Sequence, residues 1–388
     1  MKKIKLLACI MSVLLLSGCW GSRELEDIAI VLGIAIGRED DGRLCAVSQI
    51  IIPSNVGIGE SGGGDSSNVY TNYYTSSEHL GNCLQDISRR CGKDVYLSHD
   101  LIILFDKTVA AEGIYDYLDY FMRDNELRIN VSVLVADGDI ADIMDTSSEL
   151  MKTPAVNMAA LADRMAVVSE WEKVTVLDFV ENMMLQQKGT AVPCVSLSEN
   201  SGKDELFIKG CAVFSGDKMV GEINTEETKG ILWLTDKMSS VDIMLKFDDN
   251  EMGVDVKRAK TKLSVEEDEN GEIYFKAKIS ADVHLITDAD DILKTMGRDA
   301  VRAKLNAAIA DQVNTSLDRM RAMGVDVFGL GDKIYKRKPK LWKEYAGTWA
   351  ERFKKTYVEI EVDSSVQESG SVAGSAKKAG EAIFYIIF

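Results

Sequence analysis

The chain of 388 residues is 46% hydrophobic, so it is long enough to form two or three domains with sizeable cores. Its net charge of −17 at pH 7 disfavours bulk attraction to nucleic acid or to anionic lipid. The seven cysteines are irregularly spaced and include no Cys-x-x-Cys pair, which argues against a disulfide framework. We expect free, buried thiols, with one local bridge between Cys83 and Cys91 as the alternative.

The N-terminal segment has the organisation of a lipoprotein signal peptide. Three lysines precede an apolar run at residues 6–16, and Leu16-Ser17-Gly18-Cys19 follows as a cleavage site with small residues. The run is shorter than the ~20 apolar residues that a transmembrane helix needs. The pattern predicts cleavage before Cys19 and attachment of diacylglycerol and an N-acyl chain to this residue. Two acyl chains of this kind would anchor the protein stably to a membrane. An ordinary signal peptide or an uncleaved anchor is the alternative.

Between residues 28 and 198, strand and helix patterns alternate, which favours a mixed α/β layer. Apolar runs at 28–36 and 44–52 on either side of an Asp-Asp-Gly turn predict a β-hairpin. The Gly- and Ser-rich loop at 57–68 lacks the Gly-Lys-Ser/Thr sequence that opens a helix in phosphate-binding loops, which argues against nucleotide binding there. Further strands are expected at 69–75, 101–105, 129–136 and 192–198, and helices at 78–91, 113–124, 139–144, 156–168 and 176–187.

The second half of the chain is expected to contain a strand meander and one long helix. Its strands are predicted at 206–213, 219–223, 243–247, 254–265 and 272–285, and a helix is predicted from Thr225. Residues 288–323 carry one apolar stripe at helical spacing, and Gly324 is a natural end for that helix.

The segment after residue 324 is predicted to contain a strand at 325–328, a helix from Pro339 and a closing strand at 358–366. Trp342, Trp349 and Phe353 share one face of that helix, so we expect them to belong to a core rather than to an interface.

These elements predict an α+β (mixed α/β) fold of three consecutive domains with mixed or antiparallel sheets and packed helices. The predicted segments are a signal peptide at 1–18, an N-terminal α/β domain at 19–198, a small central α/β domain at 199–250, a C-terminal α+β domain with the long helix at 251–368, and a flexible tail at 369–388.

The sequence offers little catalytic chemistry. His79, His99 and His284 each lack a second ligand at metal-binding spacing. Ser98, His99 and Asp100 are adjacent in sequence, but a catalytic triad is a spatial arrangement, and the chain has no nucleophile-elbow motif. We therefore expect a protein that is not an enzyme and that binds no metal or cofactor.

One basic cluster interrupts the acidic composition of the chain. Its members are Lys333, Lys336, Arg337, Lys338, Lys340 and Lys343. The cluster could contact anionic headgroups, at about 1 kcal/mol per basic residue near the surface, or an acidic loop of a partner. A solvated patch beside the start of a helix is the alternative interpretation.

Three ordered stretches carry distinctive short motifs. The first is Gly18-Cys19-Trp20 with residues 23–25 and 28–33. The second is Ile-Lys-Gly-Cys-Ala-Val-Phe at 208–214, with 218–221 and 227–230, and the third is residues 326–331 with 334–342. Taken in this order, they resemble the Ger(x)C spore germination lipoproteins. The chain departs from the family at Gly21, where an acidic residue is usual, and in the tail beyond Gly370.

The resemblance implies a non-enzymatic C subunit of a nutrient germinant receptor. Such a subunit would lie on the outer face of the spore inner membrane beside two integral membrane partners, the A and B subunits. It would need no cofactor beyond the lipid on Cys19 and no nucleic acid. The receptor would respond to amino acids, sugars or nucleosides, and the family fold is similar to three α/β domains in a row. The rival interpretation is the solute-binding lipoprotein of a transporter, although the sequence shows no repeat that would build two similar lobes.

Overall fold

The computed structural model describes residues 25–55, 68–123, 127–148, 150–185, 187–200, 202–248, 250–288 and 291–367. Cys19, most of the Gly-rich loop and the tail at 369–388 lie outside the described residues. The fold is mixed α/β, as predicted, and its described strands form two sheets. The five cysteines at 45, 83, 91, 194 and 211 are all free; those at 83, 194 and 211 are buried as expected, whereas those at 45 and 91 are partly exposed.

The first sheet contains nine described strands in the order β3-β2-β1-β5-β6-β7-β8-β9, with β4 paired to β1. The central strands β1, β5, β6 and β7 are parallel, and antiparallel strands extend the sheet on both sides. The bounds are β1 Ile28–Arg38, β2 Leu44–Ile51, β3 Tyr70–Ser77, β4 Asp94–Tyr96, β5 Ile102–Asp106, β6 Ser132–Asp137, β7 Thr190–Asn200, β8 Lys203–Ser215 and β9 Lys218–Asn224.

Helices cover both faces of this sheet. One face packs against α2 (Leu80–Cys91), α3 (Lys107–Glu112), α4 (Tyr115–Arg123) and α7 (Val176–Met184), and the other against α5 (Ile140–Asp145) and α6 (Pro154–Val167). The central strands are therefore buried on both sides, which is why β5 and β6 are short, nearly continuous apolar runs.

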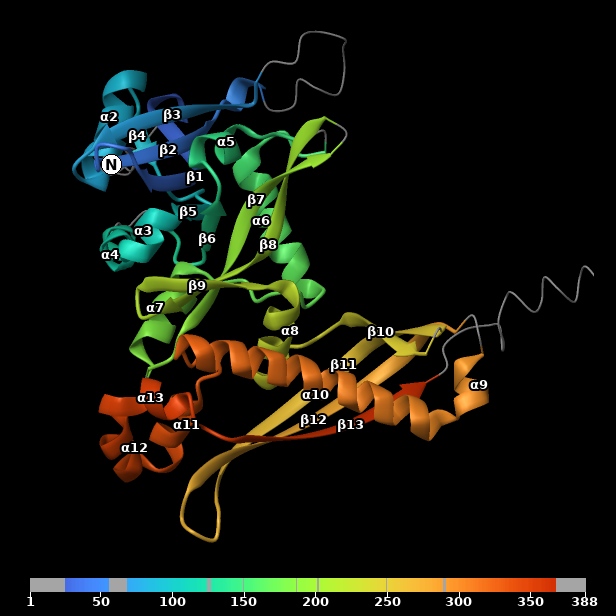
Figure 1. Cartoon of the computed structure of the whole chain (residues 1–388). Coiled ribbons are helices and arrows are strands. Elements are labelled where there is room, and N and C mark those ends of the chain that lie inside the picture. The colour runs from blue at the N-terminus through green and yellow to red at the C-terminus, as the bar shows by residue number, and fades with distance from the viewer. Residues whose placement is uncertain are drawn as a thin grey trace, which may run out of the picture.

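The second sheet has the order β10-β11-β12-β13, and long helix α10 packs on one of its faces (Figure 1). Its strands are β10 (Val241–Phe247), β11 (Asn250–Glu267), β12 (Ile273–Thr287) and β13 (Val358–Gln367). The closing strand β13 pairs parallel with β12. The predicted stripe is confirmed, because Val301, Leu305, Ile309, Val313, Leu317 and Met320 are all fully buried.

Three predicted elements differ in detail. The helix expected at 288–323 is interrupted at Gly297, whose φ of 85° is left-handed, and becomes α9 (Ile292–Met296) and α10 (Arg298–Met323). The strand expected at 325–328 is wrong, because Asp326 forms only an isolated bridge to Lys188. The helix from Pro339 divides into α12 (Pro339–Tyr345), the 3-10 turn η4 (Ala346–Thr348) and α13 (Trp349–Phe353).

The sheets divide the chain differently from the predicted domains. The boundary expected at 198/199 falls within the β7–β8 hairpin, and the one at 250/251 falls at the β10–β11 hairpin. The first sheet continues to Asn224, and α8 (Thr225–Leu234) then leads to the second. Helix α8 begins with a capping box in which Asn224 and Glu227 satisfy each other's backbone N–H groups.

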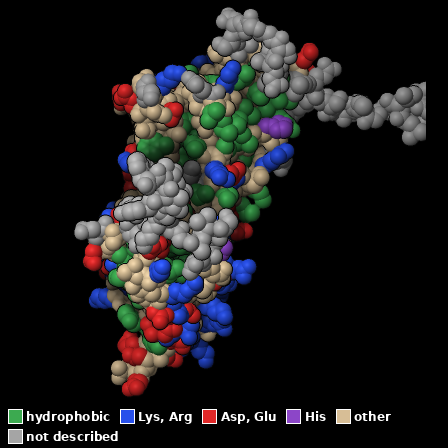
Figure 2. All heavy atoms as spheres, turned by 90° about the vertical axis from the view of Figure 1, so that its right-hand side faces the viewer, with side chains coloured by type: hydrophobic (Ala, Val, Ile, Leu, Met, Phe, Trp, Pro, Cys, Tyr) green, Lys and Arg blue, Asp and Glu red, His purple; other side chains and the backbone are tan. Residues whose placement is uncertain are grey.

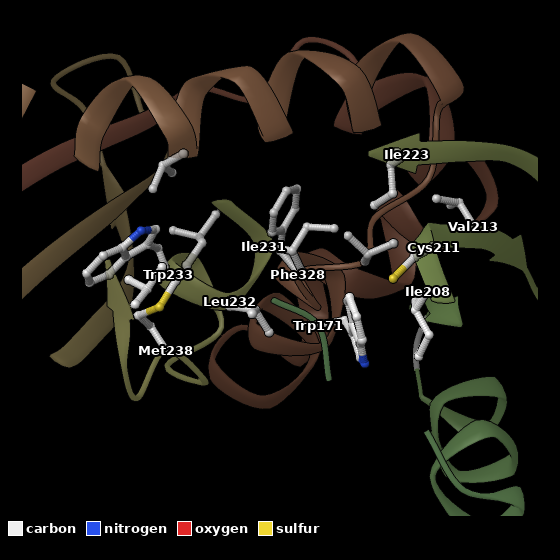
Figure 3. Close-up of a cluster of buried hydrophobic side chains, with 14 of the residues drawn as sticks. Trp171, Ile208, Cys211, Val213, Ile223, Ile231, Leu232, Trp233, Met238 and Phe328 are labelled. Carbon is white, nitrogen blue, oxygen red and sulfur yellow. The ribbon is translucent and has the colours of Figure 1, made fainter. Parts of the chain in front are cut away.

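The core around α8 joins the two sheets. Figure 3 shows Ile231 and Leu232 of α8 beside Phe328, with Trp233 next to Met238 on one side of them and side chains from β8 and β9 on the other. Trp233 donates its indole N–H to Gln312 Oε1 of α10 at 2.9 Å. A Cβ at Gly230 would collide with Ser316 Oγ and the Gln312 carbonyl, so the glycine allows α8 and α10 to approach closely. The two sheet regions therefore share one continuous hydrophobic core.

Candidate functional site

The basic cluster lies on two short helices that the chain builds beside the second sheet. Helix α11 (Leu330–Arg337) follows Gly329, whose φ of 72° is left-handed, and α12 begins with Pro339 in the first helical position. Proline suits this position because its ring fixes φ and its missing N–H is not needed there. Leu330, Ile334 and Trp342 are buried on the inner side of the two helices, which leaves the basic side chains on the outer side.

Asp326 fixes the start of α11 from within the core. Its Oδ2 accepts the Gly331 N–H at 2.8 Å and the Trp349 indole N–H at 3.1 Å. Burial raises the pKa of this carboxyl, while those N–H groups act in the opposite direction. The side chain therefore ties the turn before α11 to α13. The sequence placed Asp326 within an expected strand and gave no sign of this role.

The aromatic side chains beneath the helices form a core, as predicted. Trp342, Trp349 and Phe353 are at most 3% exposed. The rings of Trp342 and Trp349 meet edge to face with centroids 5.5 Å apart. Because they come from α12 and α13 rather than from one helix, the packing holds these two short helices in a fixed arrangement. The helices that carry the outer basic side chains are therefore held in place by this aromatic packing.

In the structure, some of the predicted basic residues are exposed, whereas others form ion pairs or are partly buried. Lys338 Nζ pairs with Glu267 Oε2 of β11 at 2.5 Å, which ties the helices to the second sheet. Lys336 Nζ pairs with Asp332 at 2.6 Å but stays exposed. Lys333 is only partly exposed, and its side chain lines an internal cavity. We define the basic surface by its exposed members, which are Lys336, Arg337, Lys340 and Lys343.

Charge on this part of the molecule is divided between two neighbouring features. The basic surface is made by α11 and α12, whereas the β11–β12 hairpin carries exposed Glu267, Asp268 and Glu269 towards its end. Figure 2 shows acidic side chains at the lower end of the molecule, where this hairpin ends. Within the described ranges, Arg337, Lys340 and Lys343 form no ion pair, so their charges face outward. This arrangement suits contact with an anionic surface.

Other predicted sites gain no support from the geometry. The lipid site, Cys19, lies outside the described residues. In the described part of the chain, no three His, Cys, Asp or Glu side chains are placed to hold a metal ion. Asp100 is 4% exposed and lies in the core beside β5, whereas His99 packs against Tyr96.

A search of the helices within the described ranges found none with the length and apolar character needed to cross a bilayer.

Comparisons with known proteins match both halves of the chain in order. Residues 21–197 match the family model described as "Spore germination protein N-terminal domain". Residues 209–370 match the model "Spore germination B3/GerAC like, C-terminal". The chain belongs to the Ger(x)C family of spore germination proteins. The Ger(x)C resemblance in the sequence is thereby confirmed.

Curated Ger(x)C relatives match along nearly their whole length. Spore germination protein KC of Bacillus subtilis (strain 168) is 24% identical over 93% of this chain and 94% of its own. Spore germination protein B3 of the same organism is 22% identical over 93% and 96%, respectively. The crystal structure of the GerBC protein is similar with a TM-score of 0.54 at 17% identity, covering 86% of this chain and 96% of that one. This last likeness shows the shared fold.

Proposed function

We propose that this chain is the lipid-anchored, non-enzymatic subunit of a spore nutrient germinant receptor, required for its assembly or signalling. The observation that carries the proposal is the full-length match. Both family models fit in order, and spore germination protein KC aligns over 93% of this chain. An architecture shared from end to end supports a shared role better than one matching domain would.

The anchor is proposed to be diacylglycerol and an N-acyl chain on Cys19, which would hold the protein on the outer face of the spore inner membrane. Ile28, the first residue of β1, follows Cys19 by nine residues. Nine extended residues span at most ~30 Å, so the lipid would keep the first sheet close to the bilayer. The integral membrane A and B subunits are the proposed partners there.

The basic surface is proposed to contact an acidic segment of such a partner. Strand β1 lies in the upper part of Figure 1 and α11 to α13 in the lower part, so the anchored end and the basic surface are at opposite ends of the molecule. A surface remote from the anchor is badly placed to reach the same headgroups. Cosedimentation of the Cys19→Ala protein with anionic vesicles checks this choice, because strong binding would favour headgroups over a partner.

The experiment that tests the main proposal replaces Cys19 with Ala in the native spore former. We expect the variant protein to leave the membrane fraction and the spores to germinate more slowly with nutrients. Lys304→Ala is the matched control, since Lys304 is exposed on α10 and far from Cys19 in the sequence. Membrane association that persists in the Cys19→Ala spores would contradict the lipid anchor.

The rival is a solute-binding lipoprotein, and one observation bears on it directly. Such a protein is built from two similar lobes, whereas this chain has a nine-stranded mixed sheet beside a four-stranded sheet. Calorimetry of the detergent-solubilised protein with neutral sugars, which carry no anionic group, would separate the two functions. Tight binding by the isolated subunit would favour the rival.

A further inference from the structure

A cavity of about 360 Å³ lies where the two sheet regions meet. Its walls come from α7 and the start of β7 on one side, and from α8, β11 and α11 on the other. Ile231, Leu232 and Phe328 supply an apolar wall, and Figure 3 shows these three side chains close together beneath α10. Pockets for small molecules have volumes of ~300–1,000 Å³, so this one can hold an organic body of modest size.

The carboxylates that line the cavity are already satisfied by protein groups. Glu172 pairs with Lys237 at 3.0 Å. Asp178 accepts the backbone N–H of Thr175 at 2.9 Å in the capping box of α7. Asp236 accepts the Thr261 N–H at 2.6 Å and also pairs with Lys260. None of these groups therefore needs a cation from a ligand.

Two lysines that line the same cavity lack such partners. Lys188 Nζ donates to the neutral amide oxygen of Asn182 at 2.7 Å, and it forms no ion pair with a described residue. The ammonium group of Lys333 has neither an ion pair nor a hydrogen bond among the described residues. Burial lowers the pKa of both ammonium groups. Carboxylates further away oppose this effect in part, Glu172 at Lys188 and Asp332 at Lys333, but neither ammonium group has a direct ion pair. A partly buried cation without a direct ion pair is costly unless an anion compensates it.

We propose that this cavity binds a small molecule carrying a carboxylate or phosphate group, held by the ammonium groups of Lys188 and Lys333. The apolar wall would contact the body of the ligand. Because the two lysines come from opposite sides of the contact between the sheet regions, the bound anion also links those regions. The proposal does not depend on the role in germination, since it concerns binding to the isolated subunit.

The test titrates purified full-length protein in detergent micelles with succinate, acetate or inorganic phosphate at constant ionic strength. We expect heat of binding and a higher midpoint of thermal unfolding with at least one of these anions. Binding of phosphate alone identifies a phosphate group, and binding of succinate or acetate identifies a carboxylate. Either outcome supports the site. The absence of binding at millimolar concentration for all three would overturn it.

Lys188→Met and Lys333→Met keep the aliphatic stem and remove the charge, so each should weaken binding by about tenfold or more. Lys304→Met, on the exposed side of α10, is the matched control and should bind like the wild type. Since neither cavity lysine has a carboxylate partner, both variants should fold, and circular dichroism checks this. Wild-type affinity in either cavity variant would contradict the proposal.

Discussion

The two sheets of this protein differ in how many of their faces are covered by helices. The first is covered by helices on both faces, and β6 reads as five buried residues followed by one that is partly exposed. The second has α10 packed on one face, and β10 alternates buried and exposed residues along its length. A sheet that is enclosed on both sides is a structural core, whereas a sheet with an open face leaves polar side chains accessible.

The difference extends to the charged groups. In the first region, Asp100 is buried, and desolvation raises the pKa of its carboxyl well above the usual value. In the second, Glu361 is exposed on β13, where a hydrogen bond and ion pairing with Lys276 lower the pKa of its carboxyl. Ionisation of Asp100 thus costs stability, whereas the pairing of Glu361 with Lys276 favours the ionised carboxylate.

The greatest loss of stability is expected from a substitution that creates a cavity in the core of the first sheet. Leu104 on β5 is fully buried in the core that the first sheet shares with α5 and α6. Leu104→Ala should lower the free energy of unfolding by about 2–5 kcal/mol, because the surrounding side chains of this packed core can close the cavity only in part. Urea unfolding measures this change. If the free energy of unfolding fell only as much as it does for substitution of an exposed residue, the first sheet would not be the tightly packed core described above.

The next effect concerns the contact between the regions. Gly230→Ala should lower the free energy of unfolding by about 1–3 kcal/mol, because the added methyl group meets the Gln312 carbonyl of α10. Gly347→Ala is the matched control, since nothing lies near a Cβ at that position. Urea unfolding of both variants measures the difference. Equal stability would show that α8 and α10 can separate freely.

A smaller effect should depend on pH. The folded protein holds Asp100 with a raised pKa, so the carboxyl contributes stability below its unfolded pKa, and this contribution is lost as pH rises through the folded pKa. Asn is neutral like the protonated acid. Asp100→Asn should therefore resist urea better than the wild type at pH 8, and the advantage should shrink at pH 5. If the stability advantage of the variant grew as the pH fell, burial would not be raising the pKa of Asp100.

The smallest effect is expected on the open face of the second sheet. Met244 on β10 is 55% exposed, whereas its neighbour Leu245 is 1% exposed. Met244→Ala should change the free energy of unfolding by less than about 0.5 kcal/mol. The same urea assay applies. A loss as large as that of Leu104→Ala would mean that something covers this face.

Local patterns were sufficient to predict most single elements. The β1–β2 hairpin and the buried stripe of α10 follow from spacing along a short stretch of chain. The pairing of β13 with β12 joins residues some 80 positions apart, and no local pattern encodes it. Gly297 interrupts the long helix because its left-handed φ is compatible with glycine, a choice that periodicity alone does not reveal.

The candidate site shows the same limit. The cluster of basic residues was visible in the sequence, because six cations lie within eleven positions of an acidic chain. Which of them face outward was not visible, because that depends on distant segments. Lys338 is engaged by Glu267 at the end of β11, and Lys333 turns to a cavity that also contains Lys188. Lys188 itself gave no signal, since it is a single lysine at the end of a helix pattern.

The proposed role of this protein is that of a receptor subunit beside integral membrane partners. Its most direct test places a photo-crosslinking amino acid at Lys340 on the basic surface, and another at Lys304 on α10 as a control, in spores that carry the protein. We expect inner membranes to yield a crosslink from position 340 to an integral membrane subunit of the germinant receptor, and none from position 304. Crosslinks from position 340 to lipid alone would contradict it.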